Sequence, residues 1–356
     1  MVHHGVDAGA PTRSVGLVPP LAPDRPPTWS GTALVVRGTD VLERTSLGPA
    51  AAPDGPACSP ATRFQAGSVS KLVVAVVVLR LVEQGLLRLD EPVGHRFAGA
   101  PRTWEGMTVA QLLGHTSGLG HWGDVPGLGA SFASAPPSRE DLLAMVVEAP
   151  LVSPPGRAWH YSGPGFLVAA GVVEAATGAS YGAVVDDLVL RPAGLLATTS
   201  GRHPTPETDA DVALGHRDGE VVVPHPGLTH LPGTGDLWTT AGDLVALNRA
   251  LRRGVVVAPA SAARLWTPQT SVGSGAGGGP VVVDAYGFGT FLGRVRGRPA
   301  RINPGDNPGY QSLLAHLPED DLDVVVLANA EAPAVDAALT GLISLGGLGG
   351  PATRGA

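Results

Sequence analysis

The sequence predicts an α/β fold of the α+β type, in which helices flank a central antiparallel sheet built from both chain ends. Strand-like patterns begin at Gly31, and further ones follow residue 280. The interval between them is dominated by helical patterns, so a mostly helical region is expected to be inserted over roughly residues 90–235. The chain has 356 residues, 44% of them hydrophobic, which is enough for a substantial core.

The strands of this sheet are predicted near both ends of the chain. Residues 31–48 contain two short apolar runs around the turn Gly38-Thr39-Asp40, the pattern of a hairpin. Near the C-terminus, strand patterns cover residues 281–292, 298–303, 310–318 and 321–329. The Gly-rich segment at residues 273–280 indicates a flexible loop.

Helices are predicted where apolar residues recur with helical spacing and where capping residues precede them. The segment from Ser68 to the stop at Gly85 is apolar on every face, which is typical of a buried helix. Ser138 with Asp141, and Thr240 with Asp243, have the spacing of helix caps. The predicted helices cover residues 68–84, 108–113, 138–149, 165–177, 180–190, 240–253 and 333–345.

Composition limits the classes of partner. The chain has 24 basic and 31 acidic residues, a net charge of −7, which argues against a nucleic-acid binder. Its longest apolar run, residues 72–79, is far shorter than a membrane span. The N-terminus lacks the charged start and apolar stretch of a secretory signal, so a cytoplasmic location is expected. The oligomeric state stays open.

One short motif carries most of the chemistry. Ser68 stands at a helix start and Lys71 lies three residues further on, so the amine and the hydroxyl share a helical face. Lys71 is the only lysine among the 24 basic residues. An amine can lose its proton when buried, whereas a guanidinium cannot. The pair therefore predicts a serine nucleophile with an adjacent base.

The sequence resembles the serine β-lactamase and penicillin-binding protein superfamily, and within it the branch of class C β-lactamases and DD-peptidases. Five segments carry the resemblance in order. They are FQAGSVSKLVVAVVVLRLVEQGLLRLDEPV, TVAQLLGHTSGL, PGRAWHYSGPGFLVAAGVVEAATGASY, LWTTAGDLVALNRAL and PGDNPGYQSLLAHLPEDDLDVVVLAN. The resemblance implies a β-lactamase-like catalytic domain over residues 30–345. Residues 1–29, rich in proline, and the tail 346–356 are expected to be poorly ordered.

The resemblance also implies roles for particular residues. Ser68 would be the acylated nucleophile, Lys71 the amine that activates it, and Tyr161 a partner in proton transfer. The backbone N–H groups of Ser68 and Asp306 would form the oxyanion hole. Whether Lys71 or Tyr161 is the general base stays open.

Two departures from the family pattern bear on the substrate. The third position of the Tyr-x-Asn motif is Gly163, so its amide is missing. The third motif, usually His or Lys, a small residue and Gly, reads Asn303-Pro304-Gly305, with the acidic Asp306 next. The cation that helps to hold a substrate carboxylate is therefore absent, although Arg301 could share the strand face of Asn303. The residues expected to face substrate are His121, Trp122, Gly163, Arg301, Asn303, Gly305 and Tyr310.

We therefore expect an enzyme that works through an acyl-Ser68 intermediate. It would be an esterase, amidase or acyltransferase acting on a small-molecule acyl donor, with water, an amine or an alcohol as acceptor, in specialised metabolism. No cofactor is expected, and no metal, because the sequence contains no His or Cys pattern of a metal site. A β-lactamase or D-Ala-D-Ala carboxypeptidase is one alternative, and a non-catalytic ligand-binding module on the same fold is another.

Overall fold

The fold is described from a computed structural model, which covers residues 29–344 except 52–54, 98–99, 129–136, 203, 205–208, 210, 219, 223–230, 277–279 and 332–333. Its centre is an eight-stranded sheet with the order β2-β1-β12-β11-β10-β9-β8-β7. The strands are β1 Gly31–Arg37, β2 Asp40–Leu47, β7 Thr270–Ala276, β8 Val281–Tyr286, β9 Phe291–Val295, β10 Arg298–Asn307, β11 Tyr310–Leu317 and β12 Leu322–Ala328.

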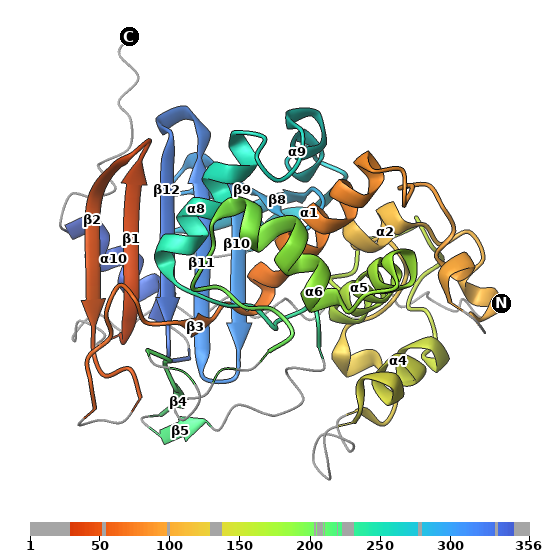
Figure 1. The fold of residues 1–356 in the computed structure, drawn as a ribbon, viewed down its shortest axis with the longest axis horizontal. Helices are drawn as coiled ribbons and strands as arrows, with labels where there is room; N and C mark the ends of the chain where they lie inside the picture. The colour runs from red at the N-terminus through yellow and green to blue at the C-terminus, as the bar shows by residue number, and fades with distance from the viewer. Residues whose placement is uncertain are drawn as a thin grey trace, which may run out of the picture.

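Strands from the two ends of the chain pair with each other in this sheet, where β1 lies beside β12 (Figure 1). β1 pairs with β12 in antiparallel register, with Leu34 opposite Val325, and β1 also pairs with β2. The remaining strands form an antiparallel meander in which each hydrogen-bonds to its sequence neighbour. The predicted antiparallel sheet from both chain ends is confirmed.

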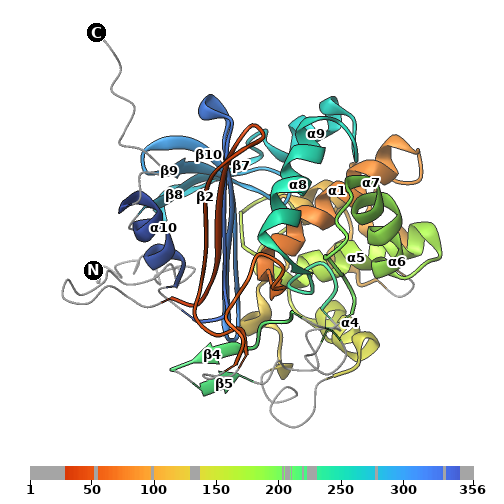
Figure 2. The same cartoon turned by 60° about the vertical axis from the view of Figure 1, so that its left-hand side comes forward.

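Helices cover both faces of the sheet, as the edge-on view shows (Figure 2). On one face α10, Ala334–Ser344, packs against β11 and β12. On the other face α8, Ala241–Arg252, packs against β1 and β12, and α1 lies beyond it. Each face has its own apolar cluster, because side chains alternate between the two sides of a strand.

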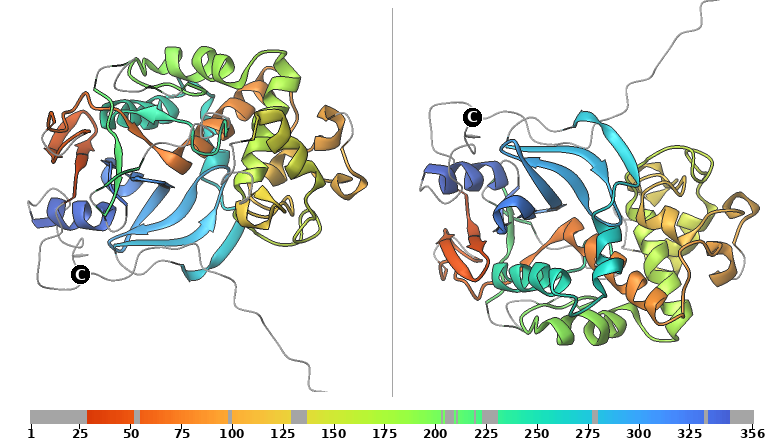
Figure 3. Two further views of the ribbon diagram at one scale, coloured as in Figure 1. Left: turned by 90° about the horizontal axis from the view of Figure 1, so that it is seen from below. Right: turned by 90° about the horizontal axis from the view of Figure 1, so that it is seen from above.

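Helix α1, Ser70–Glu83, is the centre of the helical layer, between the sheet and α5 (Figure 3). It is buried continuously from Ser70 to Leu79. Because the helix has contacts on all sides, with α5, α6 and α9 among its neighbours, its sequence shows no polar face. This packing explains why a run of β-branched residues forms a helix here and not a strand.

The helical insert is also confirmed, and its helix α4 begins after Ser138, the capping residue that the sequence indicates. Thr108 caps α2 by accepting from the backbone of Gln111, and Ser138 caps α4 by accepting from Asp141. The insert contains α2 Val109–Leu113, α4 Arg139–Glu148, α5 Gly163–Thr177, α6 Tyr181–Val185, a π-helical turn Asp186–Leu190, α7 Arg191–Ala193, and the hairpin of β4 Gly215–Arg217 and β5 Glu220–Val222.

Two sequence-based expectations were wrong or incomplete. The segment from residue 273, expected to be a loop, is strand up to Ala276, because β7 adds to the free edge of β8. Helix α9, Pro259–Leu265, was not predicted, nor were the two-residue strands β3 Phe64–Gln65 and β6 Trp238–Thr239. The 3-10 turns are Gly67–Val69, Val93–Arg96, Arg102–Trp104, Trp122–Asp124 and Pro318–Asp320.

The predicted ends of the catalytic domain are not tested. Residues 1–28 and 345–356 lie outside the described part of the chain, so the N-terminal segment 1–29 and the tail 346–356 stay predictions. Within the described part, no single helix is long and apolar enough to cross a bilayer, although α5 followed by α6 to α7 passes that test as a bent pair.

Candidate active site

Ser68 lies in the 3-10 turn Gly67–Val69 between β3 and α1, where β10 comes very close to the chain. Gly67 has a φ of +52°, and a Cβ there would be 2.8 Å from the backbone nitrogen of Asp306. A Cβ on Gly305 would be 2.1 Å from the carbonyl oxygen of Ala66. Two glycines therefore allow the backbone of β10 to lie against the turn that carries Ser68.

Hydrogen bonds fix this turn from both sides. Ser70, which is buried, donates to the carbonyl oxygen of Gly67 at 2.8 Å and accepts from the backbone of Leu237 at 3.0 Å. Ser312 on β11 donates to the carbonyl oxygen of Ala66 at 2.7 Å. A nucleophile held on both sides in this way needs little reorganisation before attack.

Lys71 faces Ser68 one helical turn further on. Its Nζ donates to the Oγ of Ser68 and to the carbonyl oxygen of Thr234, both at 2.9 Å. Only 3% of Lys71 is exposed. Burial lowers the pKa of Lys71 to about 7, although the negative charge of Asp236 opposes the shift. The amine is therefore neutral in a large fraction of molecules at neutral pH.

Tyr161 completes the group around the nucleophile. Its hydroxyl is hydrogen-bonded to Ser68, and Lys71 Nζ lies 5.1 Å from the centroid of its ring. Burial raises the pKa of Tyr161 to about 12, the hydrogen bond to Ser68 opposes this, and the charge of Asp306 adds to it. The phenol keeps its proton at neutral pH and can donate it. Of the two residues, Lys71 has the pKa of a base at this pH.

Trp122 occupies the space beside the Tyr-x-Asn position. A Cβ built on Gly163 would be 2.3 Å from Trp122 Nε1 and 2.7 Å from Cε2. The indole therefore lies where a side chain at this position would point. The missing amide is replaced by an aromatic surface next to the Ser162–Tyr161 turn.

Two histidines support the same turn. His121 accepts from the backbone of Gly163 at 3.2 Å, and burial lowers its pKa to about 4, with Lys71 adding to the shift. His115 accepts from the backbone of Ser162 at 3.1 Å, and its ring lies 4.5 Å from that of Tyr161. Burial also holds the pKa of His115 well below its usual range. Both rings are neutral at pH 7 and add no positive charge to the site.

The third motif, Asn303-Pro304-Gly305, is not arranged to bind a substrate carboxylate. The Asn303 amide donates to the carbonyl oxygen of Gly289 at 2.7 Å, so it is used to hold the turn before β9. Pro304 has no N–H, and the side chain of Asp306 is exposed. Asn303 and Gly305 thus shape the site, while Asp306 supplies a negative charge at its edge.

Arg301 does not restore the missing cation. Its guanidinium stacks 3.6 Å from the ring centroid of Trp266, just after α9. Arg301 is the cross-strand partner of His316. Their side chains therefore share the face of the sheet that α8 covers, where His316 contacts Arg252. The sequence correctly suggested that Arg301 and Asn303 share a face, but the guanidinium is held by an indole and not by the reacting centre.

Tyr310 is not brought to the site either. Only 1% of it is exposed, its hydroxyl donates to the carbonyl oxygen of Ala213 at 2.9 Å, and its ring packs edge-on against Trp238. These contacts belong to a small separate core. The expectation that Tyr310 faces substrate finds no support in this placement.

The sequence interpretation missed the segment that holds Lys71 from the other side. Asp236 is 3% exposed and accepts from Ser200 Oγ at 2.6 Å and from the backbone of Gly233 at 2.7 Å. Together these bonds fix the turn that presents the Thr234 carbonyl to Lys71. A buried aspartate so close to the only lysine is a signal, but its spatial neighbours are not visible in the sequence.

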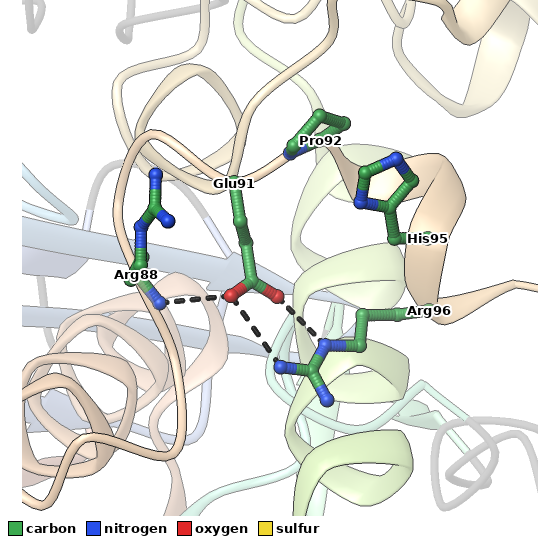
Figure 4. Close-up of a pocket in the computed structure, with 5 residues that line it drawn as sticks. All are labelled: Arg88, Glu91, Pro92, His95 and Arg96. Carbon is green, nitrogen blue, oxygen red and sulfur yellow. Dashed lines mark hydrogen bonds and ion pairs between the residues drawn. The ribbon is translucent and has the colours of Figure 1, made fainter.

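A surface pocket elsewhere has a different character. It is lined by Arg88, Glu91, Pro92, His95 and Arg96, and within it Glu91 pairs with Arg96 and accepts from the backbone of Arg88 (Figure 4). It lies beyond the C-terminal end of α1, whereas Ser68 precedes the N-terminal end. Among the described residues, no group of three or more His, Cys, Asp or Glu is placed to hold a metal ion.

Comparison with known proteins agrees with this architecture. The family model described as Beta-lactamase matches residues 28–346. Penicillin-binding protein 4* of Bacillus subtilis (strain 168) is 26% identical over 324 residues, which cover 85% of this chain and 68% of that protein. Esterase EstB of Burkholderia gladioli is 36% identical over 176 residues, covering 46% of this chain and 45% of the esterase. The crystal structure of a penicillin-binding protein from Bacillus halodurans covers 89% of this chain and 96% of its own, with a TM-score of 0.75 and 27% identity.

The fold and the Ser68–Lys71 pair together define a serine hydrolase. The chain belongs to the Beta-lactamase family, as the match over nearly its whole length shows. The resemblance seen in the sequence is confirmed.

Proposed function

We propose that this enzyme transfers acyl groups from small esters or amides through an acyl-Ser68 intermediate, as an esterase, amidase or acyltransferase. The observation that carries the proposal is the 2.9 Å contact between Lys71 Nζ and Ser68 Oγ. Because the pKa of Lys71 is lowered to about 7, this contact joins a nucleophile to a base that is ready at neutral pH.

Acylation follows from this geometry. Neutral Lys71 takes the hydroxyl proton of Ser68 as Oγ forms a bond to the substrate carbonyl carbon. The carbonyl oxygen becomes an oxyanion, held by the backbone N–H groups of Ser68 and Asp306, which lie against each other across the Gly67 turn. When the intermediate collapses, the bond to the leaving group breaks, and Tyr161 donates the proton that the departing oxygen or nitrogen needs. The proton on Lys71 then restores the phenol.

Deacylation reverses these roles. Lys71 deprotonates water, an amine or an alcohol, the acceptor attacks the acyl carbon, and Ser68 leaves and recovers its proton. Water as acceptor makes the protein a hydrolase, and another acceptor makes it a transferase. The indole of Trp122 lies against Gly163, at the turn that follows Tyr161, and an aromatic surface there favours a bulky or apolar acceptor.

The alternatives have specific observations for and against them. Relatives include penicillin-binding proteins, which supports peptidase or β-lactamase activity. Against these activities, Asn303 is engaged with Gly289, Pro304 has no donor and Asp306 repels a substrate carboxylate. The non-catalytic module is disfavoured because Ser68, Lys71 and Tyr161 are held in contact. The expected roles in specialised metabolism and in the cytoplasm stay predictions.

The test is intact-protein mass spectrometry with 4-nitrophenyl butanoate, run on the wild type and on Ser68→Ala. We expect a mass gain of one butanoyl group, or steady release of 4-nitrophenol, in the wild type only. Adding amines or alcohols then identifies the acceptor from the product. Equal and negligible reaction of both proteins would overturn the enzymatic proposal.

A further inference from the structure

Strand β10 has an edge that extends past its neighbour. Its pairing with β9 runs from Arg298 to Ile302 and ends there, because β9 begins at Phe291 opposite Ile302. From Pro304 onward the strand continues alone on that side, beside the turn that carries Ser68. Such an edge is where an extended substrate can lie next to the nucleophile.

Strand alternation places the Asp306 side chain on the face where Tyr161 lies. Gly305 packs on Ala66, and Asn307 donates to the carbonyl oxygen of Gly235, so odd positions face the turn of the nucleophile. Even positions share the face of Ile302 and its cross-strand partner Phe291. The Tyr161 ring stacks on Phe291 with centroids 6.0 Å apart. The Asp306 side chain is exposed on this face, and its charge acts on Tyr161, whose pKa it helps to raise.

This carboxylate has no ionic partner among the described residues. Lys71 is occupied by Ser68 and Thr234, and Arg301 stacks on Trp266. The nearby Glu331 is paired with Arg217 at 2.7 Å and accepts from the backbone of Gly309. Asp306 is thus the exposed, uncompensated charge at this edge.

We propose that Asp306 forms a binding site for a cationic group of the substrate, so that the preferred esters or amides carry an ammonium group a few bonds from the scissile carbonyl. This inference rests on the proposed acyl-Ser68 function and adds the substrate class to it. The backbone of Asp306 is beside the oxyanion position, which sets the short spacing between carbonyl and cation. A charge-assisted hydrogen bond from the ammonium group to the carboxylate of Asp306 would hold the substrate in place.

The surroundings of Asp306 suit a cation and not an anion. The ring of Tyr161, on which the charge of Asp306 acts, lies 5.6 Å from that of His121, and His121 in turn contacts Trp122, so aromatic π faces surround this side of the site. His121 is neutral at pH 7 because burial lowers its pKa to about 4. Glu331 and Asp306 together make the local potential negative, and each disfavours an acidic substrate.

The test compares two esters that differ only in charge. The 4-nitrophenyl esters of 3-aminopropanoate and of butanoate have acyl chains of the same length, ending in an ammonium or a methyl group. The readout is the ratio of kcat/KM for the ammonium ester over that for the methyl ester, measured at pH 7. Comparing this ratio between proteins cancels the different intrinsic reactivities of the two esters.

We expect the ratio to fall about fivefold in Asp306→Asn, as for loss of a partly solvated charge pair, and to be largely kept in Asp306→Glu. In the wild type, the ratio should also fall as salt is raised from 20 mM to 500 mM. Dissolved ions screen an exposed charge pair, and at high salt the Debye length shrinks to about a few Å. The matched control is Asp90→Asn, which removes an exposed charge beyond the far end of α1 and should keep the wild-type ratio.

The outcomes separate this inference from the proposed function. If the wild type neither hydrolyses the butanoate ester nor forms its adduct, the acyl-enzyme proposal fails. If the butanoate ester is turned over but the ratio is the same in Asp306→Asn and wild type, only the cation site is overturned. Should Asp306→Asn not fold by circular dichroism, a salt-independent ratio in the wild type overturns the site by itself.

Discussion

The indole of Trp122 fills the space that a side chain on residue 163 would need. A Cβ on Gly163 would lie 2.3 Å from Trp122 Nε1 and 2.7 Å from Cε2, both too close for real atoms. Gly163 is also the first residue of α5, and its backbone donates to His121. The absence of a side chain at Gly163 and the position of the Trp122 indole therefore depend on each other, and a substitution at one residue is expected to disturb the other.

Gly163→Ala should destabilise the protein and slow acylation, because the new methyl group must displace an indole packed beside Tyr161. We expect a loss of about 1–3 kcal/mol in the free energy of unfolding, as for overpacking at a filled position. Urea denaturation measures the loss, and release of 4-nitrophenol measures the rate.

The control for this substitution is Gly123→Ala, which follows Trp122 in the 3-10 turn Trp122–Asp124. A Cβ there meets nothing within 4 Å, so stability and rate should stay near wild type. In a Trp122→Ala background the Gly163→Ala substitution should cost much less. An unchanged cost in that background would show that the indole is not what excludes the methyl group.

The rate of acylation should rise with pH and level off, with a midpoint near 7. Lys71 acts in its neutral form, and burial lowers its pKa to about 7. The rate is therefore low below the midpoint, where the amine is protonated, and full above it. A profile of kcat/KM between pH 5 and 9 tests this. Lys71→Arg, which keeps the charge and removes the titration, should lower the rate about 100-fold or more.

The same pKa predicts an effect on stability. Between about pH 7 and 10.4 the unfolded chain binds a proton on Lys71 that the folded chain has lost, so stability rises with pH across this window. Lys71→Met lacks this group. Its free energy of unfolding relative to wild type should be most favourable at pH 6 and should decline toward pH 10. A pH-independent difference would contradict the lowered pKa of Lys71.

Asp236 should act on catalysis through Lys71 and not by touching substrate. Its charge raises the pKa of Lys71, so Asp236→Asn should move the midpoint of the rate profile to lower pH. The single amide oxygen of Asp236→Asn can accept from only one of Gly233 and Gly201, which donate to different carboxylate oxygens, whereas Asp236→Ala leaves both donors unpaired and should cost more, about 1–3 kcal/mol of stability. If the midpoint moved up or stayed fixed in Asp236→Asn, this positioning role would be refuted.

The fold was predictable where the pattern is local. The predicted capping residues Ser138 and Thr240 both precede helices in the structure, because a side-chain oxygen can satisfy a nearby N–H without any distant partner. The spacing of Ser68 and Lys71 likewise depends only on helical geometry, and it predicts their contact correctly.

What the sequence could not show depends on long-range packing. The strand from Thr270 is Gly-rich and forms because β8 offers an unpaired edge, which local composition does not reveal. Tyr310 and Arg301 were expected near substrate. Instead the ring of Tyr310 packs against Trp238 and the guanidinium of Arg301 stacks on Trp266, and both tryptophans are distant in sequence. Contacts of this kind, between side chains far apart in the sequence, are seen only in the three-dimensional structure.

A second group of charges is buried between β12 and α8, away from the reacting centre. Asp323, which is fully buried, accepts from Arg252 at 2.9 Å and from Asn248 at 3.1 Å, and lies 2.9 Å from His316 Nδ1. Burial alone would raise the pKa of Asp323, but the hydrogen bonds from His316 and Arg252 outweigh it and lower that pKa. The carboxylate is thus ionised in the folded protein over a wider pH range than in the unfolded chain.

Asp323→Asn should therefore destabilise the protein strongly at neutral pH, because Arg252 would lose its buried partner and keep only the exposed Asp321, at 3.6 Å. We expect a loss of about 3–5 kcal/mol, measured by urea denaturation at pH 7. The stabilisation from ionised Asp323 is present above the ordinary aspartate pKa of about 3.9 and is lost as pH falls through the lower folded value. The difference between variant and wild type should consequently shrink in acid. Asp90→Asn, at an exposed pair, is the control and should change stability by less than about 1 kcal/mol at either pH. A difference of the same size at pH 3 and pH 7 would mean that Asp323 contributes through its shape and not through its charge.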